Sequence, residues 1–235
     1  MNDSNVNPFC ENCPDLNFRN RGAGFEGDEF NPSRMFNIYK KGETVFSEGN
    51  KPTGVFCLKK GKLKIHRTGI KFREQIIRFV AKGELLGARA MIRNEYYTSS
   101  ATAIEDSLIC YIPKKEFMKV HKSSRKLSEH ILKNLIENLN LAEEKTVHLS
   151  HNSIRVRLAR SLLKLREMYG LKEDGLTLEV ELTREELANL IGAATETTIR
   201  MLSAFKKEKK IELSGKNLKI LNIDSLEDLV KGPSQ

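Results

Sequence analysis

The sequence has no long hydrophobic run and no N-terminal targeting pattern. Its first residues, MNDSNVNPFCENCP, lack a basic segment followed by an apolar one, which argues against a secretory signal peptide. No apolar stretch approaches the roughly 20 residues that a membrane-spanning helix needs. We therefore expect a cytoplasmic protein with no membrane partner.

Cysteine is scarce, and signatures of common enzyme sites are missing. Four cysteines without a secretory signal argue against a disulfide framework and leave metal-binding, redox or packing roles. The chain has no P-loop, no nucleophile elbow and no pair of carboxylates in a catalytic context. A C-x-x-C near the N-terminus lacks the βαβ setting of a thioredoxin-like site. We predict that the protein is not an enzyme.

Positive charge is abundant instead. The 235 residues carry a formal charge of +9, with a pI of about 9.3. This balance favours a polyanionic partner such as nucleic acid, although it does not identify one. The length allows one large domain or two small ones with real cores.

The amino-acid pattern of the N-terminal half changes along its length. Residues 1–30 carry few structure signals apart from the C-x-x-C and are predicted to form a tail. Residues 31–113 consist of short β-prone runs separated by glycine, such as KLKIHR and EQIIRFV, and end with ATAIEDSLICYIP. This pattern predicts an antiparallel, barrel-like sandwich of short strands.

Residues 114–150 are predicted to form a long helix, because no Gly or Pro occurs from Lys114 to Leu149. Apolar or small residues recur there at alternating steps of three and four, as in a coiled coil. One interpretation is a helix that packs on its own barrel through Leu127, Ile131 and Ile136. The other adds a parallel homodimer, formed through Leu132, Leu135, Leu139, Ala142, Thr146 and Leu149.

Residues 151–235 are predicted to form a second domain after a hinge near residues 149–153. Ser153 is a candidate N-cap for a helix that starts with IRVRLARSL, and GLTLEVEL is predicted to be a short strand. Thr183 and Glu186 have the spacing of a capping box. Gly192 suits the end of that helix, and a second helix is expected to begin near Ala194–Thr195 and to bury Met201, Leu202 and Phe205.

Two helices joined by a tight turn are typical of a DNA-binding helix-turn-helix. Arg can donate to guanine O6 and N7, and Glu can accept from cytosine N4; Glu196 and Arg200 lie one turn apart and can brace each other. Phosphate contacts suit Thr183 and Arg184, and FKKEKKIELSGKNLKIL predicts a lysine-rich wing that turns at Gly215. The competing interpretation is an ordinary solvated helix pair. The predicted outward face is Thr195, Glu196, Thr197, Ile199 and Arg200.

The order of these segments resembles the CRP/FNR family of bacterial transcription regulators, from about residue 35 to 228. FSEG, GKLKIHR, FVAKGELLG and DSLICYIP resemble its roll, and LTREELANLIGAATETTIRML resembles its DNA-reading unit. The resemblance implies an α+β fold: an N-terminal double-stranded β-helix like a cyclic nucleotide-binding domain, a dimerisation helix and a C-terminal winged helix-turn-helix. It also implies a homodimer on a two-fold symmetric double-stranded DNA operator, with RNA polymerase as partner if it activates.

The family's base-reading Glu and Arg correspond to Glu196 and Arg200, and its phosphate-contacting Arg to Arg184. Thr195 stands where the cyclic-AMP branch has Arg, and Ile199 stands where the FNR branch has Ser. These two departures leave the half-site sequence undefined. A contact from Ile199 to a thymine methyl group is one alternative.

The resemblance argues against cyclic AMP as the effector. Ala88 replaces the Glu of the family's nucleotide grip, and Ser99–Ser100 replaces its Arg-Ser pair. Without that Arg, the phosphate lacks its main charge-assisted partner. Arg89 offers a neighbouring guanidinium, so the argument is not absolute.

The FNR branch holds an iron–sulfur cluster, and Cys10, Cys13 and Cys110 match three of its ligand positions. The third N-terminal cysteine is missing, because Arg19 stands six residues beyond Cys13. A four-iron cluster would need a fourth ligand, which is Asp15, another carboxylate or Cys57, and Cys57 fits packing better. A zinc or thiol-redox role and an incidental C-x-x-C stay open. Two further alternatives are a cofactor-free regulator, controlled by abundance or a small molecule, and a β-roll regulatory module of an enzyme.

Overall fold

The computed structural model describes residues 35–69, 74–80 and 82–231. These residues form two compact units. One unit contains the described residues up to 67 together with residues 78–140, and the other contains those of 68–77 and from 141 onward. The predicted domain boundaries at residues 30, 113 and 150 stay predictions.

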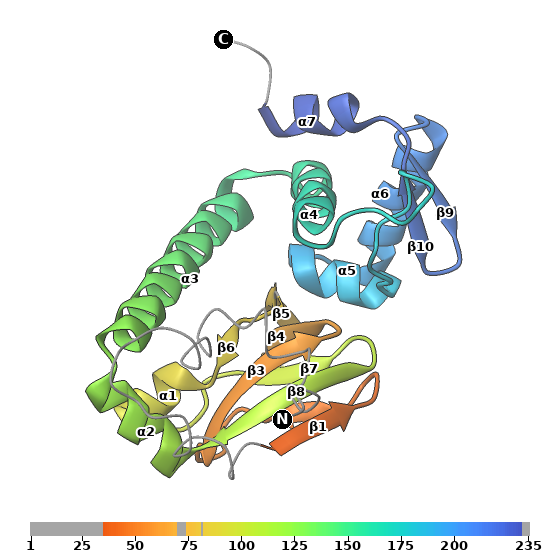
Figure 1. The fold of residues 1–235 in the computed structure, drawn as a ribbon. Coiled ribbons are helices and arrows are strands. Elements are labelled where there is room, and N and C mark those ends of the chain that lie inside the picture. Colours follow the sequence, from red (N-terminus) through yellow and green to blue (C-terminus); the bar gives the residue numbers. More distant parts are fainter. Residues whose placement is uncertain (1–34, 70–73, 81, 232–235) are drawn as a thin grey trace. The chain divides into compact units, whose positions relative to one another are not determined.

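Short strands in the N-terminal half form two four-stranded sheets (Figure 1). One sheet has the order β1-β8-β3-β6 and the other the order β2-β7-β4-β5. The registered pairs are antiparallel, which confirms the predicted sandwich, here called the β-roll. Its strands are β1 (Met35–Tyr39), β2 (Thr44–Phe46), β3 (Gly54–Lys60), β4 (Leu63–Thr68), β5 (Glu74–Val80), β6 (Leu85–Leu86), β7 (Ser100–Ala103) and β8 (Ser107–Pro113).

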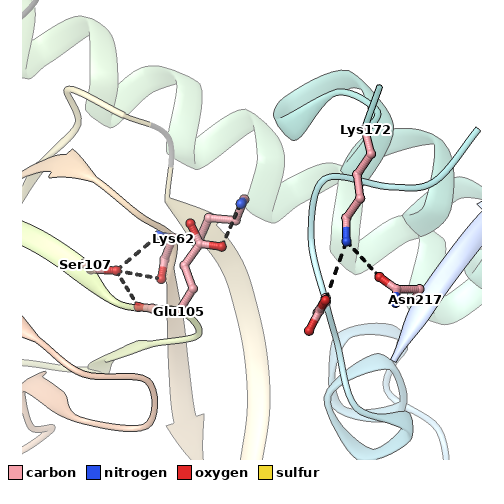
Figure 2. A network of polar contacts seen from close by, with 6 residues as sticks. Lys62, Glu105, Ser107, Lys172 and Asn217 are labelled. Atoms are coloured by element: carbon pink, nitrogen blue, oxygen red, sulfur yellow. Dashed lines mark hydrogen bonds and ion pairs between the residues drawn. The ribbon is translucent and has the colours of Figure 1, made fainter. Parts of the chain in front are cut away.

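The turn between β3 and β4 shows why glycine punctuates these strands. Gly61 has φ +96°, and a Cβ there would lie 2.3 Å from the Ser107 Oγ. That hydroxyl accepts from the Lys62 backbone N–H at 3.2 Å and donates to the Glu105 carbonyl at 2.8 Å. Lys62 Nζ and the Glu105 carboxylate form an ion pair at 2.7 Å (Figure 2). The turn is thereby tied to the start of β8.

Helices cover one face of the β1-β8-β3-β6 sheet. They are α1 (Ala88–Arg93), α2 (Lys114–Ser123) and the first part of α3 (Arg125–His151). Alternate residues of a strand share a face, so Val55 and Cys57 of β3 lie beside Cys110 and Ile112 of β8. All four belong to a buried cluster whose helical members are Ala88, Met91, Phe117, Val120, Leu127 and Ile131.

Two expectations about the long helix are wrong. The helix is interrupted at Ser124, whose Oγ accepts from the Leu127 backbone N–H at 3.2 Å; Ser is a preferred helix N-cap, so it separates α2 from α3. Ile136 is 49% exposed, while Leu135 packs against the roll-side cluster. A five-residue step from Ile131 turns about 140° around a helix, whereas a step of four stays on the same face.

An apolar stripe on α3 faces solvent. Leu132 and Leu139 are each 58% exposed. Ala142, Thr146 and Leu149 are exposed as well. Large apolar side chains that recur along one helix in this way mark a surface for a partner. The predicted dimer contact therefore stays a prediction, with Leu135 shared with the roll.

The first helix after α3 is α4 (Ile154–Tyr169). The Ser153 side chain accepts from the Val156 backbone N–H at 3.3 Å, which confirms the predicted N-cap. GLTLEVEL is not a strand: it takes part only in the isolated bridges Leu171–Leu178 and Thr177–Lys219. The remaining elements are α5 (Arg184–Ile191), α6 (Thr195–Lys207), β9 (Ile211–Ser214), β10 (Asn217–Ile220) and α7 (Ile223–Lys231), of which α7 was not expected.

Candidate nucleic-acid interface

Helix α5 begins with a complete capping box, as predicted. Thr183 Oγ1 accepts from the Glu186 backbone N–H at 3.0 Å, and the Glu186 carboxylate accepts from the Thr183 backbone N–H at 2.8 Å. The two contacts satisfy two N–H groups that a helix start leaves without intrahelical partners. The start of α5, with Arg184 as its first residue, is therefore well defined.

The turn between α5 and α6 depends on Gly192. Its φ of +64° and ψ of +49° are left-handed, and its N–H donates to the Ala188 carbonyl. Glycine adopts this conformation without the strain that a Cβ would add. Helix α6 then starts at Thr195 after Ala194, as predicted. Leu202 and Phe205 are buried, whereas Met201 is only half-buried.

The outward face of α6 carries groups that suit base edges. Glu196, Ile199 and Arg200 are exposed, and Ile199 keeps 44% of its surface in solvent. Thr195 and Thr197 are half-buried at its margin. The predicted brace between Glu196 and Arg200 is absent from the ion pairs of the described residues, because the guanidinium donates to Thr197 Oγ1 at 3.4 Å. Ile199 is therefore partly packed within the unit and partly available to a partner.

The wing is a two-stranded hairpin beside the helix pair. β9 and β10 pair from Ile211–Ile220 to Ser214–Asn217. Arg184 Nη2 donates to the carbonyl of Gly215 at the hairpin turn, at 3.0 Å. This contact joins the α5 start to the wing tip, next to the exposed Lys216. The two predicted phosphate-contacting regions are thus physically connected.

A lysine also holds the wing next to its turn (Figure 2). Lys172 Nζ donates to Asn217 Oδ1 on β10 at 2.8 Å and forms an ion pair with Glu181 at 3.5 Å. Just beyond it, Asp174 accepts from the backbone N–H groups of Leu176 and Thr177 and from the Thr177 hydroxyl. These hydrogen bonds hold the pKa of Asp174 well below its usual range. The segment before α5 is therefore shaped by turn chemistry, which explains why no strand forms there.

Two arginines of α4 position the helix pair, and sequence reasoning missed both. Arg157 Nη1 donates to the Ile191 carbonyl at 2.8 Å and to the Gly192 carbonyl at 3.4 Å. Arg155 lies 4.9 Å from the centre of the Phe205 ring and forms an ion pair with Glu208 after α6. The hydrogen bond from Arg155 holds the pKa of the Glu208 carboxyl below its usual range. The pattern IRVR was the only available signal, and it does not reveal which carbonyls the guanidinium groups reach.

The roll segments that grip a nucleotide in the resemblance look different here. Ala88 is 7% exposed and belongs to the apolar cluster under the helices. Ser100 Oγ accepts from the Glu48 backbone N–H at 2.9 Å, and Arg89 donates to Thr98 Oγ1. Arg89 is exposed and is the one charged group among these three side chains.

Aromatic rings contact one another near those segments. Phe46 stacks on Tyr97 at 4.3 Å and on Phe56 at 5.6 Å, and Phe56 lies 5.2 Å from the Tyr111 ring. The Tyr97 hydroxyl donates to the Gly54 carbonyl at 3.2 Å. Burial raises the pKa of Tyr97 to about 12, so the phenol stays a neutral hydrogen-bond donor.

The described cysteines do not by themselves form a metal site. Cys110 and Cys57 are both buried in the apolar cluster, and Cys57 takes the packing position that was predicted. Cys10 and Cys13 lie outside the described residues. Within residues 35–69, 74–80 and 82–231, no three His, Cys, Asp or Glu side chains gather as metal ligands would.

Comparisons with known proteins agree with this architecture. Residues 36–124 match the model of the cyclic nucleotide-binding domain, and residues 156–229 match that of the Crp-like helix-turn-helix domain. The "Probable transcriptional regulator flp" of Lacticaseibacillus casei is 30% identical over 171 residues, which cover 72% of this chain and 75% of that protein. The chain belongs to the CRP/FNR family of transcription regulators.

Two further comparisons give the similarity of this chain to a curated regulator and to a solved structure. The "CRP-like cAMP-activated global transcriptional regulator" of Mycobacterium tuberculosis is 28% identical over 189 residues, covering 80% of this chain and 84% of that protein. The structure of FixK2 from Bradyrhizobium japonicum aligns with a TM-score of 0.76 over 86% of this chain and 99% of that one, at 18% identity. The second likeness shows the fold alone.

This CRP/FNR chain is therefore a DNA-binding transcription regulator with a cyclic nucleotide-binding-like domain. In the part of the chain that the structure describes, no helix has both the length and the apolar character to cross a membrane.

Proposed function

We propose that the chain acts as a homodimer that binds a two-fold symmetric DNA operator through α6. The observation that carries the proposal is the exposed face of Glu196, Ile199 and Arg200 on α6, which follows the capped helix α5 and the left-handed turn at Gly192. A recognition helix in the major groove presents such residues to base edges. Arg200 would read a guanine, Glu196 a cytosine, and Ile199 a thymine methyl group.

Phosphate contacts set the register of this reading. Thr183 and Arg184 lie at the start of α5, and Arg184 already contacts the wing tip. Positive groups beside a helix N-terminus suit the negatively charged backbone. Together with Lys216, they would hold the duplex while α6 reads its sequence.

Dimerisation would place two copies of α6 on one face of the DNA. The exposed stripe of α3, with Leu132 and Leu139 at its centre, supports a helix-to-helix contact between two chains. The half-sites would then lie one helical turn apart, about 34 Å. A signal at the junction of the roll and α3 would change this pairing and so the spacing of the recognition helices. If the regulator activates transcription, RNA polymerase is the further partner.

For the signal, we propose that cyclic AMP is not the effector. The Glu and Arg of the family's nucleotide grip are replaced by Ala88 and Ser99, and Ala88 is packed in the apolar cluster. An iron–sulfur cluster on Cys10, Cys13 and Cys110 stays a prediction, because only Cys110 lies within the described residues. Anaerobic purification, iron and sulfide analysis and a visible spectrum, repeated on Cys110→Ala, would test it. A colourless, iron-free dimer that binds DNA favours the cofactor-free alternative.

Selection of binding sites from random-sequence DNA tests the proposed function directly. We expect the full chain to enrich a palindrome with one half-site per subunit, and Arg200→Ala to lose the preference for one base pair in each half. The matched control is Lys231→Ala, which removes one exposed charge from α7. Enrichment of no common sequence by the parent chain would contradict the proposal.

A further inference from the structure

Cys57 and Cys110 stand directly opposite each other in the β-roll. β3 and β8 are neighbours in the sheet, and their register pairs Cys57 with Cys110. Both side chains point to the helix-covered face, and they are 1% and 0% exposed. The fold thus brings together two of the four cysteines, 53 positions apart by their residue numbers.

The geometry of an antiparallel pair suits a bond between them. Directly opposed residues have Cα atoms about 4.5 or 5.5 Å apart, and disulfides accept Cα separations of about 4.4–6.8 Å. Their Cβ atoms lie about 4.5–5.5 Å apart, compared with about 3.5–4.5 Å in a disulfide. If the two Cβ atoms moved closer by about 1 Å, a disulfide could form without a rearrangement of the strands.

The pair lies directly beneath the helices that lead to the proposed dimer contact. Leu127 and Ile131 of α3 and Phe117 of α2 belong to the same buried cluster as the two thiols. Close-packed interiors transmit small displacements, because few voids can absorb them. A change in the separation of β3 and β8 at this point would therefore displace the side chains against which α3 packs.

We propose that Cys57 and Cys110 form an oxidisable dithiol, which a hydroperoxide converts into an intramolecular disulfide. The new bond would shift the β-roll surface on which α3 packs. One thiolate attacks a peroxide oxygen, the O–O bond breaks, and a sulfenic acid and hydroxide form. The second thiol displaces that hydroxyl, giving the S–S bond and water. Hydrogen peroxide and two protons become two waters in total, while the two sulfurs lose two electrons.

Burial sets the speed of this reaction. The Cys57 thiol donates to the Gly83 carbonyl at 3.6 Å, and the reactive species is the thiolate, which apolar surroundings disfavour. Oxidation will therefore be slower than that of an exposed thiol and will need brief openings of the helix cover. A small oxidant such as hydrogen peroxide suits such a site, and the disulfide needs no further ligand.

Mass spectrometry on the full chain tests the modification. We would use Cys10→Ser/Cys13→Ser as the parent, so that only two cysteines remain, and repeat the treatment on the unsubstituted chain. After reduction, desalting and exposure to hydrogen peroxide, the protein is unfolded, alkylated and digested. We expect a linked pair of peptides containing Cys57 and Cys110, two hydrogens lighter than the reduced pair, and reversed by dithiothreitol.

Four results would overturn the modification. Both thiols could stay open to alkylation after unfolding, each could be oxidised separately, or Cys110 in the unsubstituted chain could link to Cys10 or Cys13. Stoichiometric iron held by Cys110 in anaerobically purified protein would also contradict it. None of these readouts needs a core variant that might fail to fold.

The effect on α3 rests on the proposed function and has its own readout. We expect oxidation of the Cys10→Ser/Cys13→Ser chain to change its operator affinity by about 5- to 150-fold, the usual range of coupling between sites. Adding Cys57→Ala should abolish the change. A disulfide that leaves the affinity unaltered would overturn the coupling to α3. Failure of reduced and oxidised chains alike to bind DNA would overturn the proposed function and leave the disulfide result intact.

Discussion

The two units of the chain place their candidate functional residues in opposite ways. On α6, Glu196, Ile199 and Arg200 project into solvent from a helix with a buried opposite face. In the roll, Cys57, Cys110 and Ala88 lie in an apolar cluster. An outward face needs only the period of one helix to be recognised, whereas an inward one depends on which strands become neighbours.

This difference bears on what substitutions will do. A change on the outward face of α6 should alter DNA binding and leave the fold intact. A change in the roll cluster alters packing first and any signal second. Four predictions test this contrast, beginning with the surface of α3, which combines both kinds of face.

The largest effect is expected at the exposed stripe of α3. Leu132→Glu with Leu139→Glu places two negative charges where a partner helix would pack, so we expect monomers at micromolar concentration. Operator affinity should fall by roughly 10²- to 10⁴-fold, as expected when two linked contacts become one. Sedimentation and fluorescence anisotropy measure the two effects.

Lys133→Glu on the same helix is the control for these charges, because Lys133 is exposed but lies outside the stripe. It should leave the dimer intact. A double variant that sediments like the parent chain would show that the stripe is not the dimer contact.

Arg200→Ala should weaken operator binding by about 1–3 kcal/mol and relax the preference at one guanine. The reason is the loss of two hydrogen bonds to a base edge. Titration of matched and single-mismatch operators measures it. Lys216→Ala is the contrasting variant: it should weaken matched and mismatched sites alike and lower the salt dependence by about one ion. If Arg200→Ala weakened the binding of all operators equally, Arg200 would contact the DNA phosphate backbone and not a base.

Arg157→Ala should destabilise the C-terminal unit by about 1.5–3 kcal/mol, the usual range for hydrogen bonds made by charged groups. The substitution leaves the carbonyls of Ile191 and Gly192 without this donor. Urea unfolding monitored by circular dichroism gives the stability. Arg166→Ala, an exposed position on the same helix, should have a much smaller effect. If both variants unfold alike, Arg157 does not position the turn.

Thr183→Ala is expected to have the smallest effect, about 1 kcal/mol, because it removes one side of the capping box. The midpoint of urea unfolding should fall, and the specificity among operators should stay the same. Thr183→Ser keeps the hydroxyl and is the control. A change in base preference would mean that Thr183 contributes more than helix capping and a phosphate contact.

Much of the helix-turn-helix could be predicted from local sequence. The Thr183–Glu186 capping box, the left-handed Gly192 and the Ser153 N-cap each depend on residues within a few positions of one another, and all three were confirmed. Local reasoning failed where competing local chemistry was underestimated. Ser124 ends α2 by capping α3, and the Asp174 turn replaces the expected strand with isolated bridges.

The rest depended on contacts distant in sequence. Arg157 could not be assigned to the turn, because its acceptors lie 34 and 35 positions away. Ile136 and Leu135 exchanged their expected roles, since the angle at which α3 meets the roll selects the face. The Cys57–Cys110 pair is invisible until the register of β3 and β8 is known.

By itself, the sequence determined the order of the segments, the capped helix-turn-helix and the face of α6 that can meet DNA, because these follow from backbone preferences and helical period over short stretches. Only the tertiary structure decided which α4 arginines hold the turn, which side of α3 packs on the roll and which two thiols face each other. Strand register and helix packing are set by the burial of residues far apart in the chain, and no local pattern contains that information.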